Sequence, residues 1–147
     1  MAVAVQAVLL VVAVAPRLSA RLMGDEYLVR VAPVDPIDPF RGAYVRLQYP
    51  DLLSDDAAGR REDERVFIPL VRDGGLWRGG GLLADRPEDG PYLACRYDGG
   101  LRCGIESLFL SQTEARSLER DLASGGGVAR LRVDGRGHAA VVAVEPG

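Results

Sequence analysis

The chain has 147 residues, of which 48% are hydrophobic and 27% charged, so we expect one globular domain with a single core. A formal net charge of -3 argues against a dedicated nucleic-acid-binding protein. Every basic residue is Arg, which excludes a Schiff-base lysine, a Ser–Lys dyad and a phosphate-loop lysine. The single histidine, His138, excludes a multi-histidine zinc site.

The N-terminal segment differs in composition from the rest of the chain. Ala2–Ala15 carries no charged residue and stops at Pro16. This run is shorter than the ~20 residues of a full membrane span. We expect residues 1–23 to form a hydrophobic anchor or signal-like segment that associates with a membrane through residues 2–15. The alternative is a buried strand, because Val and Ala dominate the run. Residues 24–147 would then form the folded domain.

Strand patterns dominate the rest of the sequence. In Ala43–Tyr49, apolar and polar residues alternate, which predicts a strand with one buried face. We expect seven or eight short strands in all, among them the following: Tyr27–Ala32, Ala43–Tyr49, Val66–Arg72, Leu93–Tyr97, Leu101–Leu110, Val128–Val133 and His138–Glu145. Short hairpin connections favour an antiparallel barrel or sandwich over a βαβ arrangement.

One helix is signalled near residues 112–123. Ser111 and Glu114 have the spacing of a capping box, with Ser111 as the N-cap. Ala115, Leu118 and Leu122 recur at helical spacing, and three glycines follow. The expected fold class is therefore mainly β (α+β), a compact antiparallel barrel or sandwich with this helix.

Two cysteines flank the clearest hairpin turn, Asp98-Gly99-Gly100. If these three residues form the loop, Cys95 lies opposite Cys103 with a Cα separation of ~4.5–5.5 Å, which a disulfide can bridge. An oxidising envelope compartment would favour the disulfide, whereas in the cytosol both thiols would stay reduced.

A longer pattern precedes and enters the second predicted strand. Residues 33–42 read PVDPIDPFRG and run into AYVRLQY at residues 43–49. This resembles the GDYXXLXY family, whose hallmark is such a proline-rich lead followed by G-D-Y-x-x-L-x-Y. The matching positions are Gly42, Tyr44, Leu47 and Tyr49, whereas Ala43 replaces the family's Asp. A second block, Gly104-Ile105-Glu106 with Phe109, is also similar to the family.

The resemblance implies a location rather than a chemistry. Members of this family usually carry an N-terminal hydrophobic anchor and are often encoded near integral membrane proteins. We therefore expect a cell-membrane or extracytoplasmic location, with the cytoplasm as the alternative, and an integral membrane protein as partner. No cofactor and no nucleic-acid partner is expected.

The proline-rich lead holds the first candidate site. Prolines restrict the backbone around Asp35 and Asp38, so these carboxylates, with Arg41, could be pre-organised for a cation or an amine. The structural alternative is that each Asp closes a turn and that Asp38 pairs with Arg41. If the fold brings Glu106 close, three carboxylates could bind Ca²⁺.

The second candidate is the polar face of the 43–49 strand. Tyr44 and Arg46 share this face and could line a recognition groove, although packing beneath a loop is the ordinary role for such residues. Gly42 and Tyr49 belong to the same motif.

Two functions from different classes follow. The first is a non-catalytic, membrane-associated accessory or interaction domain. The alternative is an envelope hydrolase or cation-binding protein that uses Asp35, Asp38 and Glu106.

Overall fold

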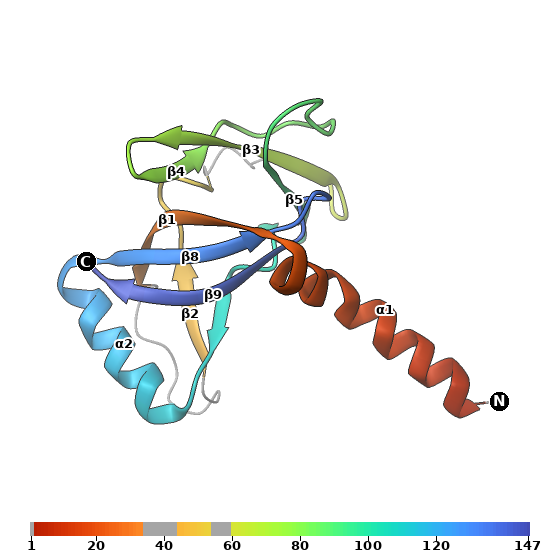
Figure 1. Cartoon of the computed structure of the whole chain (residues 1–147), viewed down its shortest axis with the longest axis horizontal. Helices are drawn as coiled ribbons and strands as arrows, with labels where there is room; N and C mark the ends of the chain where they lie inside the picture. The colour runs from red at the N-terminus through yellow and green to blue at the C-terminus, as the bar shows by residue number, and fades with distance from the viewer. Residues whose placement is uncertain (1, 34–43, 54–59) are drawn as a thin grey trace.

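The computed structural model describes residues 2–33, 44–53 and 60–147, and it consists of a long helix leading into a curled half-barrel sheet (Figure 1). In chain order the elements are α1 (Ala2–Met23), β1 (Asp25–Pro33), β2 (Tyr44–Gln48), β3 (Arg65–Asp73), β4 (Leu76–Gly79), β5 (Tyr92–Tyr97), β6 (Leu101–Arg102), β7 (Ser107–Phe109), α2 (Gln112–Gly125), β8 (Gly127–Val133) and β9 (Ala139–Pro146). The mainly β prediction is confirmed.

The sheet has the strand order β6-β5-β3-β4-β1-β2-β7, and β8 joins it by pairing with both β1 and β9. Its ladders are antiparallel with one exception in the described part of the chain, the parallel contact between Val29 of β1 and Trp77 of β4. The strand β1 therefore lies at the centre, where it meets β2, β4 and β8.

The core lies inside the curl of the sheet. Buried and less buried residues alternate strictly along β8, as expected for a strand with one face in the core. In β2 the predicted alternation is also confirmed, since Val45, Leu47 and Tyr49 are buried while Arg46 and Gln48 are exposed.

Helix α2 covers one end of the sheet (Figure 1) and confirms the predicted caps. The Ser111 N–H donates to the Glu114 carboxylate at 3.0 Å, and the Glu114 N–H donates to Ser111 Oγ at 3.4 Å. At the other end Gly126 adopts a φ of 71° and its N–H donates to the Leu122 carbonyl. The buried side chains of α2 are the predicted Ala115, Leu118 and Leu122.

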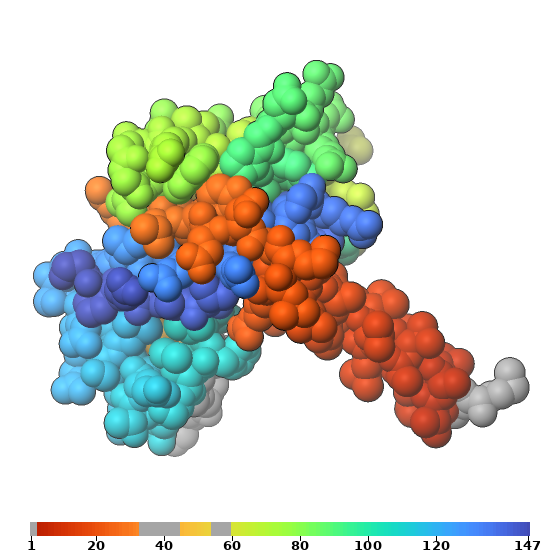
Figure 2. All heavy atoms as spheres, viewed as in Figure 1, coloured from red at the N-terminus to blue at the C-terminus, as the bar shows by residue number. Residues whose placement is uncertain are grey.

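The N-terminal segment forms a helix, so the buried-strand alternative for residues 2–15 is wrong. The helix does not stop before Pro16 but continues through it to Met23. Figure 2 shows α1 projecting from the body of the domain, with only its C-terminal end packed against the sheet.

The predicted hairpin turn between β5 and β6 is confirmed, but the expected second arm, Leu101–Leu110, is not one strand: β6 ends at Arg102, and β7 pairs with β2 instead. Tyr97 pairs with Leu101 and Arg96 with Arg102, as a three-residue loop requires. Cys95 and Cys103 form a disulfide with a Cα separation of 4.3 Å, slightly below the range expected from the sequence.

Candidate functional site

The surface of α1 is the most unusual feature of the described structure. Its large apolar side chains are between 50% and 78% exposed, and they are Val3, Val5, Val8, Leu9, Leu10, Val11, Val12, Val14, Leu18, Leu22 and Met23. The stretch Val3–Met23 has the length and apolar composition of a membrane-crossing helix. A core helix of similar composition would be mostly buried, whereas this one is not.

The C-terminal end of α1 is fastened to the β domain. Ala20 is completely buried, and Ser19 Oγ donates a 2.7 Å hydrogen bond to Asp134 in the β8–β9 turn. The Arg132 guanidinium donates to the carbonyl of Arg21. A Cβ on Gly24 would lie 2.4 Å from the Ala20 carbonyl oxygen, so the chain can leave the helix this tightly only at a glycine. The helix and the domain are thus joined by packing and hydrogen bonds as well as by the chain itself.

Asp134 is the centre of this junction. Besides Ser19 Oγ, its carboxylate accepts the backbone N–H groups of Arg136 and His138, at 2.9 and 3.0 Å. The His138 ring Nδ1 lies 3.0 Å from the second carboxylate oxygen. Burial alone would raise the pKa of Asp134, but the hydrogen bonds from Ser19, Arg136 and His138 outweigh it and lower the pKa below its usual value.

A pH dependence follows from this lowered pKa. The carboxylate of Asp134 contributes stability above the pKa of the unfolded chain, ~3.9, and this contribution is lost as the pH falls through the folded value. At pH 7 Asp134→Asn should be less stable than the wild type, and the difference in unfolding free energy should shrink below about pH 4. Urea unfolding at a series of pH values measures it. Asp89→Asn, on the exposed loop before β5, is the control and should follow the wild type; a pH-independent difference for Asp134→Asn would contradict the assignment.

The disulfide is linked to the β8–β9 turn through β5. The Ala94 N–H donates to the Gly137 carbonyl at 2.9 Å, so β5, which carries Cys95, is hydrogen-bonded to the turn that holds α1. Disulfides persist in oxidising compartments, so this bridge hints at an extracytoplasmic location.

The candidate residues of the proline-rich lead lie outside the part of the chain that the structure describes. Asp35, Asp38, Arg41 and Gly42 lie outside the described residues, as does the side chain of Tyr44. Arg46 is exposed on β2, opposite Ser107 of β7. The structure therefore places Arg46 on the surface of the domain.

The remaining two candidates, Tyr49 and Glu106, lie side by side. The Leu47 N–H donates to the Glu106 carbonyl at 2.9 Å, next to the ladder of β2 with β7. The Tyr49 hydroxyl, which is buried, donates to the Ile105 carbonyl at 2.6 Å. Residues 44–49 and 104–109 are thus packed together as neighbouring strands and their flanks.

Glu106 uses its carboxylate locally. The oxygens accept the backbone N–H groups of Cys103 and Gly104, which closes the turn after the disulfide. Within the parts of the chain that the structure describes, no group of three His, Cys, Asp or Glu residues could hold a metal ion.

The hydroxyl of Tyr49 is a buried donor that stays protonated. Burial and, secondarily, the nearby charge of Glu106 raise the pKa of Tyr49. Tyr49→Phe should lower the free energy of unfolding by about 1–2 kcal/mol, because the Ile105 carbonyl would lose its partner in the core. Urea unfolding measures this loss. Tyr97→Phe, where the partly exposed hydroxyl has no bond to the described residues, is the matched control; equal losses in both variants would contradict the role of the bond.

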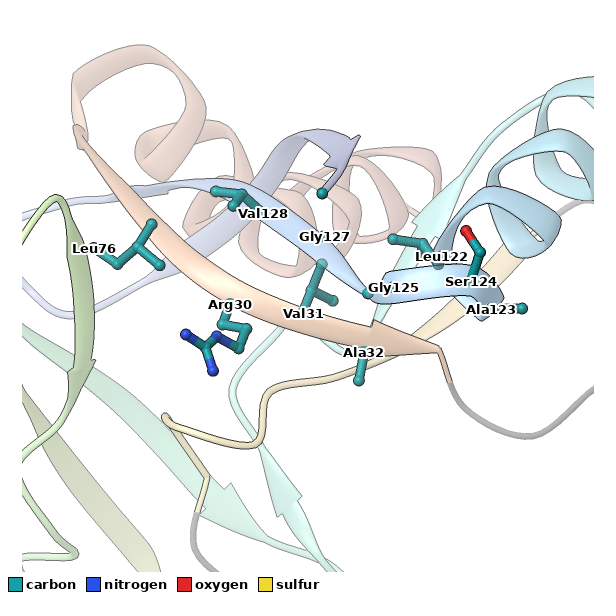
Figure 3. A pocket seen from close by; sticks show the side chains of 12 residues that line it. Arg30, Val31, Ala32, Leu76, Leu122, Ala123, Ser124, Gly125, Gly127 and Val128 are labelled. Atoms are coloured by element: carbon teal, nitrogen blue, oxygen red, sulfur yellow. The ribbon is translucent and has the colours of Figure 1, made fainter.

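A surface pocket of about 620 Å³ lies between β1, β8 and the C-terminal end of α2 (Figure 3). Its lining is largely apolar or glycine, including Val31, Leu122 and Gly125–Gly127, with Arg30 as its charged residue. It contains no pair of titratable groups positioned for acid–base chemistry.

A comparison with known protein families shows which family this chain is related to. The sequence matches the GDYXXLXY protein family over residues 6–144. The chain belongs to the GDYXXLXY family. No curated protein and no solved structure is significantly similar to it.

The match to the GDYXXLXY family begins inside α1 and extends almost to the end of β9. Most of the apolar helix is therefore part of the family pattern together with the β domain. The two sequence blocks that carry the resemblance are the ones that meet at β2 and β7. In this GDYXXLXY protein the described part of the motif builds the core and the turn after the disulfide.

Proposed function

We propose that this GDYXXLXY protein is a membrane-anchored, non-catalytic accessory domain, with α1 in the bilayer and the β domain on the extracytoplasmic side. The observation that carries the proposal is the apolar helix that leaves the domain with its side chains uncovered. The part of α1 before the attached Ser19, residues 3–18, is about 24 Å long, so it spans most of the ~30 Å hydrocarbon core.

The attachment of the last turns of α1 to the domain supports an anchor that is kept after synthesis. Ala20 and Ser19 belong to the fold of the domain rather than to a linker, since both contact or bond to the last hairpin. A signal segment that is removed has no need of such contacts. Arg17 and Arg21 near this end can extend their guanidinium groups to the membrane surface.

Two features of the chain give opposite indications of the side of the membrane on which the β domain lies. The disulfide of Cys95 and Cys103 favours an oxidising compartment. Arg17 and Arg21 on the domain side of α1 favour the cytoplasm by the positive-inside rule. We give the disulfide more weight because it is a covalent feature of the folded domain.

The partner we propose is an integral membrane protein. The helix α1 would place one surface of this chain inside the bilayer, where side-chain packing between helices provides the attraction. The exposed Arg46 and Gln48 of β2 provide polar groups on the domain outside the membrane.

Fractionation of cells that express the tagged full-length chain tests the proposal. We expect the chain to remain in the membrane pellet after alkaline extraction, with an intact α1 by mass. Both cysteines should react with a maleimide only after reduction, and the Cys95→Ala, Cys103→Ala double variant controls for non-specific labelling. A soluble chain with free thiols would overturn both the anchor and its orientation.

A further inference from the structure

A second cleft on the molecule is lined by cationic side chains. It measures about 450 Å³ and lies where β3, β5 and β6 meet the β8–β9 turn. Its charged lining consists of Arg65, Arg86, Arg96, Arg102 and Arg136, together with His138. This is a concentration of positive charge on a chain whose net charge is -3.

Three of these arginines form a row across neighbouring strands. Arg65 of β3 is the direct partner of Arg96 of β5, and Arg96 is the direct partner of Arg102 of β6. Direct partners project from the same face of a sheet, and like charges at such positions repel one another. The row is an arrangement that a bound anion would stabilise.

The protein itself neutralises this charge only in part. Asp63 reaches Arg96 at 3.3 Å from an exposed position. Asp134 is engaged by Ser19 and His138. In the described parts of the chain, Arg65, Arg102 and Arg136 form no ion pair. Most of the cationic groups of the cleft thus remain available to a ligand.

Packing contacts and the disulfide hold the lining of the cleft in place. Tyr92 is buried and packs edge-to-face on Phe67, with the ring centroids 5.9 Å apart. The Arg86 guanidinium lies over the Tyr92 ring at 5.3 Å and donates a long hydrogen bond to the Gly135 carbonyl. The disulfide of Cys95 and Cys103 fixes β6 beside β5, and with it the spacing of Arg96 and Arg102.

The location of the cleft indicates the source of the anion. Arg136 and His138 belong to the turn that Asp134 joins to Ser19 of α1. Ser19 lies four residues beyond the uncharged run that ends at Ala15, which is about 6 Å along the helix axis. Figure 1 shows this turn beside β5, on the side of the domain from which α1 leaves. With α1 in a bilayer, the rim of the cleft lies at the level of the lipid headgroups.

We propose that this arginine-lined cleft binds a phosphate group, and that the headgroups of anionic lipids in the membrane supply it. Planar guanidinium groups suit phosphate because two N–H groups can bind two oxygens at once. The phosphate chemistry rests on the cleft alone, whereas the lipid as its source rests on the proposed anchoring by α1.

The test uses the full-length chain in a neutral maltoside detergent and three probes. These are inorganic phosphate, short-chain dihexanoylphosphatidylglycerol and dihexanoylphosphatidylcholine. Binding is followed by the backbone amide NMR signals of β5 and β6. We expect saturable binding of the phosphatidylglycerol at these signals, weaker binding of inorganic phosphate that competes with it, and no saturable binding of the zwitterionic phosphatidylcholine.

The variant Arg65→Gln, Arg102→Gln should weaken binding of the phosphatidylglycerol by roughly tenfold or more, because hydrogen bonds between charged partners are lost. The control pair, Arg116→Gln, Arg120→Gln, removes the same charge from the exposed face of α2 and should leave binding unchanged. Without ligand, the control pair should keep the wild-type melting temperature, and Arg65→Gln, Arg102→Gln should keep or raise it, because the repulsion between neighbouring arginines is relieved. A structural role of Arg65 and Arg102 would instead lower it.

Every other outcome overturns a defined part of the proposal. Absence of saturable binding, or equal losses in both variant pairs, overturns the cleft as a site. Saturable binding of inorganic phosphate without the phosphatidylglycerol overturns the lipid as the source. Alkaline extraction of the wild-type chain separates this proposal from the anchor: a wild-type chain that stays in the membrane but binds no probe refutes the cleft alone, and a soluble chain refutes the anchor and the lipid source together.

Discussion

Gly137→Ala should lower the free energy of unfolding by about 3 kcal/mol, the largest loss that we expect from adding one methyl group to the β8–β9 turn. Gly137 has a φ of 79°, a conformation that other residues adopt only with strain. A Cβ there would lie 2.7 Å from the Ala94 nitrogen and 2.7 Å from a ring carbon of Tyr92. The backbone cannot move away, since the Gly137 N–H and carbonyl are both hydrogen-bonded, to Asp134 and Ala94.

Urea unfolding of the full-length chain in detergent measures this loss. The matched control is Gly135→Ala in the same turn, where an added Cβ has nothing within 4 Å. This control should change the unfolding free energy by less than about 0.5 kcal/mol. If both variants lose the same unfolding free energy, the close approach of the turn to β5 is not the reason that position 137 requires glycine.

The second large effect that we expect is on the association of the chain with the membrane rather than on its stability. Leu9→Asp together with Val12→Asp should release the chain from the membrane fraction. Both side chains are exposed on α1, at 63% and 65%, so the folded domain should tolerate the change. In a bilayer, each Asp near the middle of a helix costs about 2.5–3.5 kcal/mol of insertion free energy.

Alkaline extraction followed by quantitative blotting measures the fraction released. Leu9→Met together with Val12→Ile keeps the helix apolar and should leave the chain in the pellet. The melting temperature of the released double-Asp variant should match that of the wild type in detergent. Retention of the double-Asp variant in the membrane would mean that α1 is not what holds the chain there.

Local sequence signals predicted α2 and the β5–β6 turn well, because the interactions that form these elements join residues only a few positions apart. Ser111 and Glu114 fix the start of α2 through each other, and Gly126 ends it. The Asp98-Gly99-Gly100 turn sets the register of β5 and β6, so the facing of Cys95 and Cys103 follows from counting residues.

The uncharged run stops at Pro16, but α1 continues through this residue to Met23. Proline removes one backbone hydrogen bond and crowds the preceding turn, so it disfavours a helix interior in water. Membrane helices tolerate proline better. The structure carries α1 through Pro16 because the following turn packs on the domain, with Ala20 buried and Ser19 bonded to Asp134.

The functional surfaces depend on contacts between distant parts of the sequence. No local pattern indicates that Ser19 meets Asp134, or that Arg65 is the partner of Arg96. The parallel contact of Val29 with Trp77 is equally invisible, since each strand alone resembles one arm of a hairpin. The arginine-lined cleft was therefore missed, although its arginines are plain in the sequence.

The pairing of β1 with β8 also has a consequence for synthesis on the ribosome. Val29 is the partner of Ala129, so β1 is made long before the strand that completes its ladder. At synthesis rates of about 5–20 residues per second, β1 waits roughly 5–20 s for that partner. The bond of Ser19 to Asp134 must wait longer still. If the apolar helix enters the bilayer first, the nascent chain therefore exposes the β8 edge of β1 beside the membrane until β8 is made, and chaperones of that compartment would meet this edge.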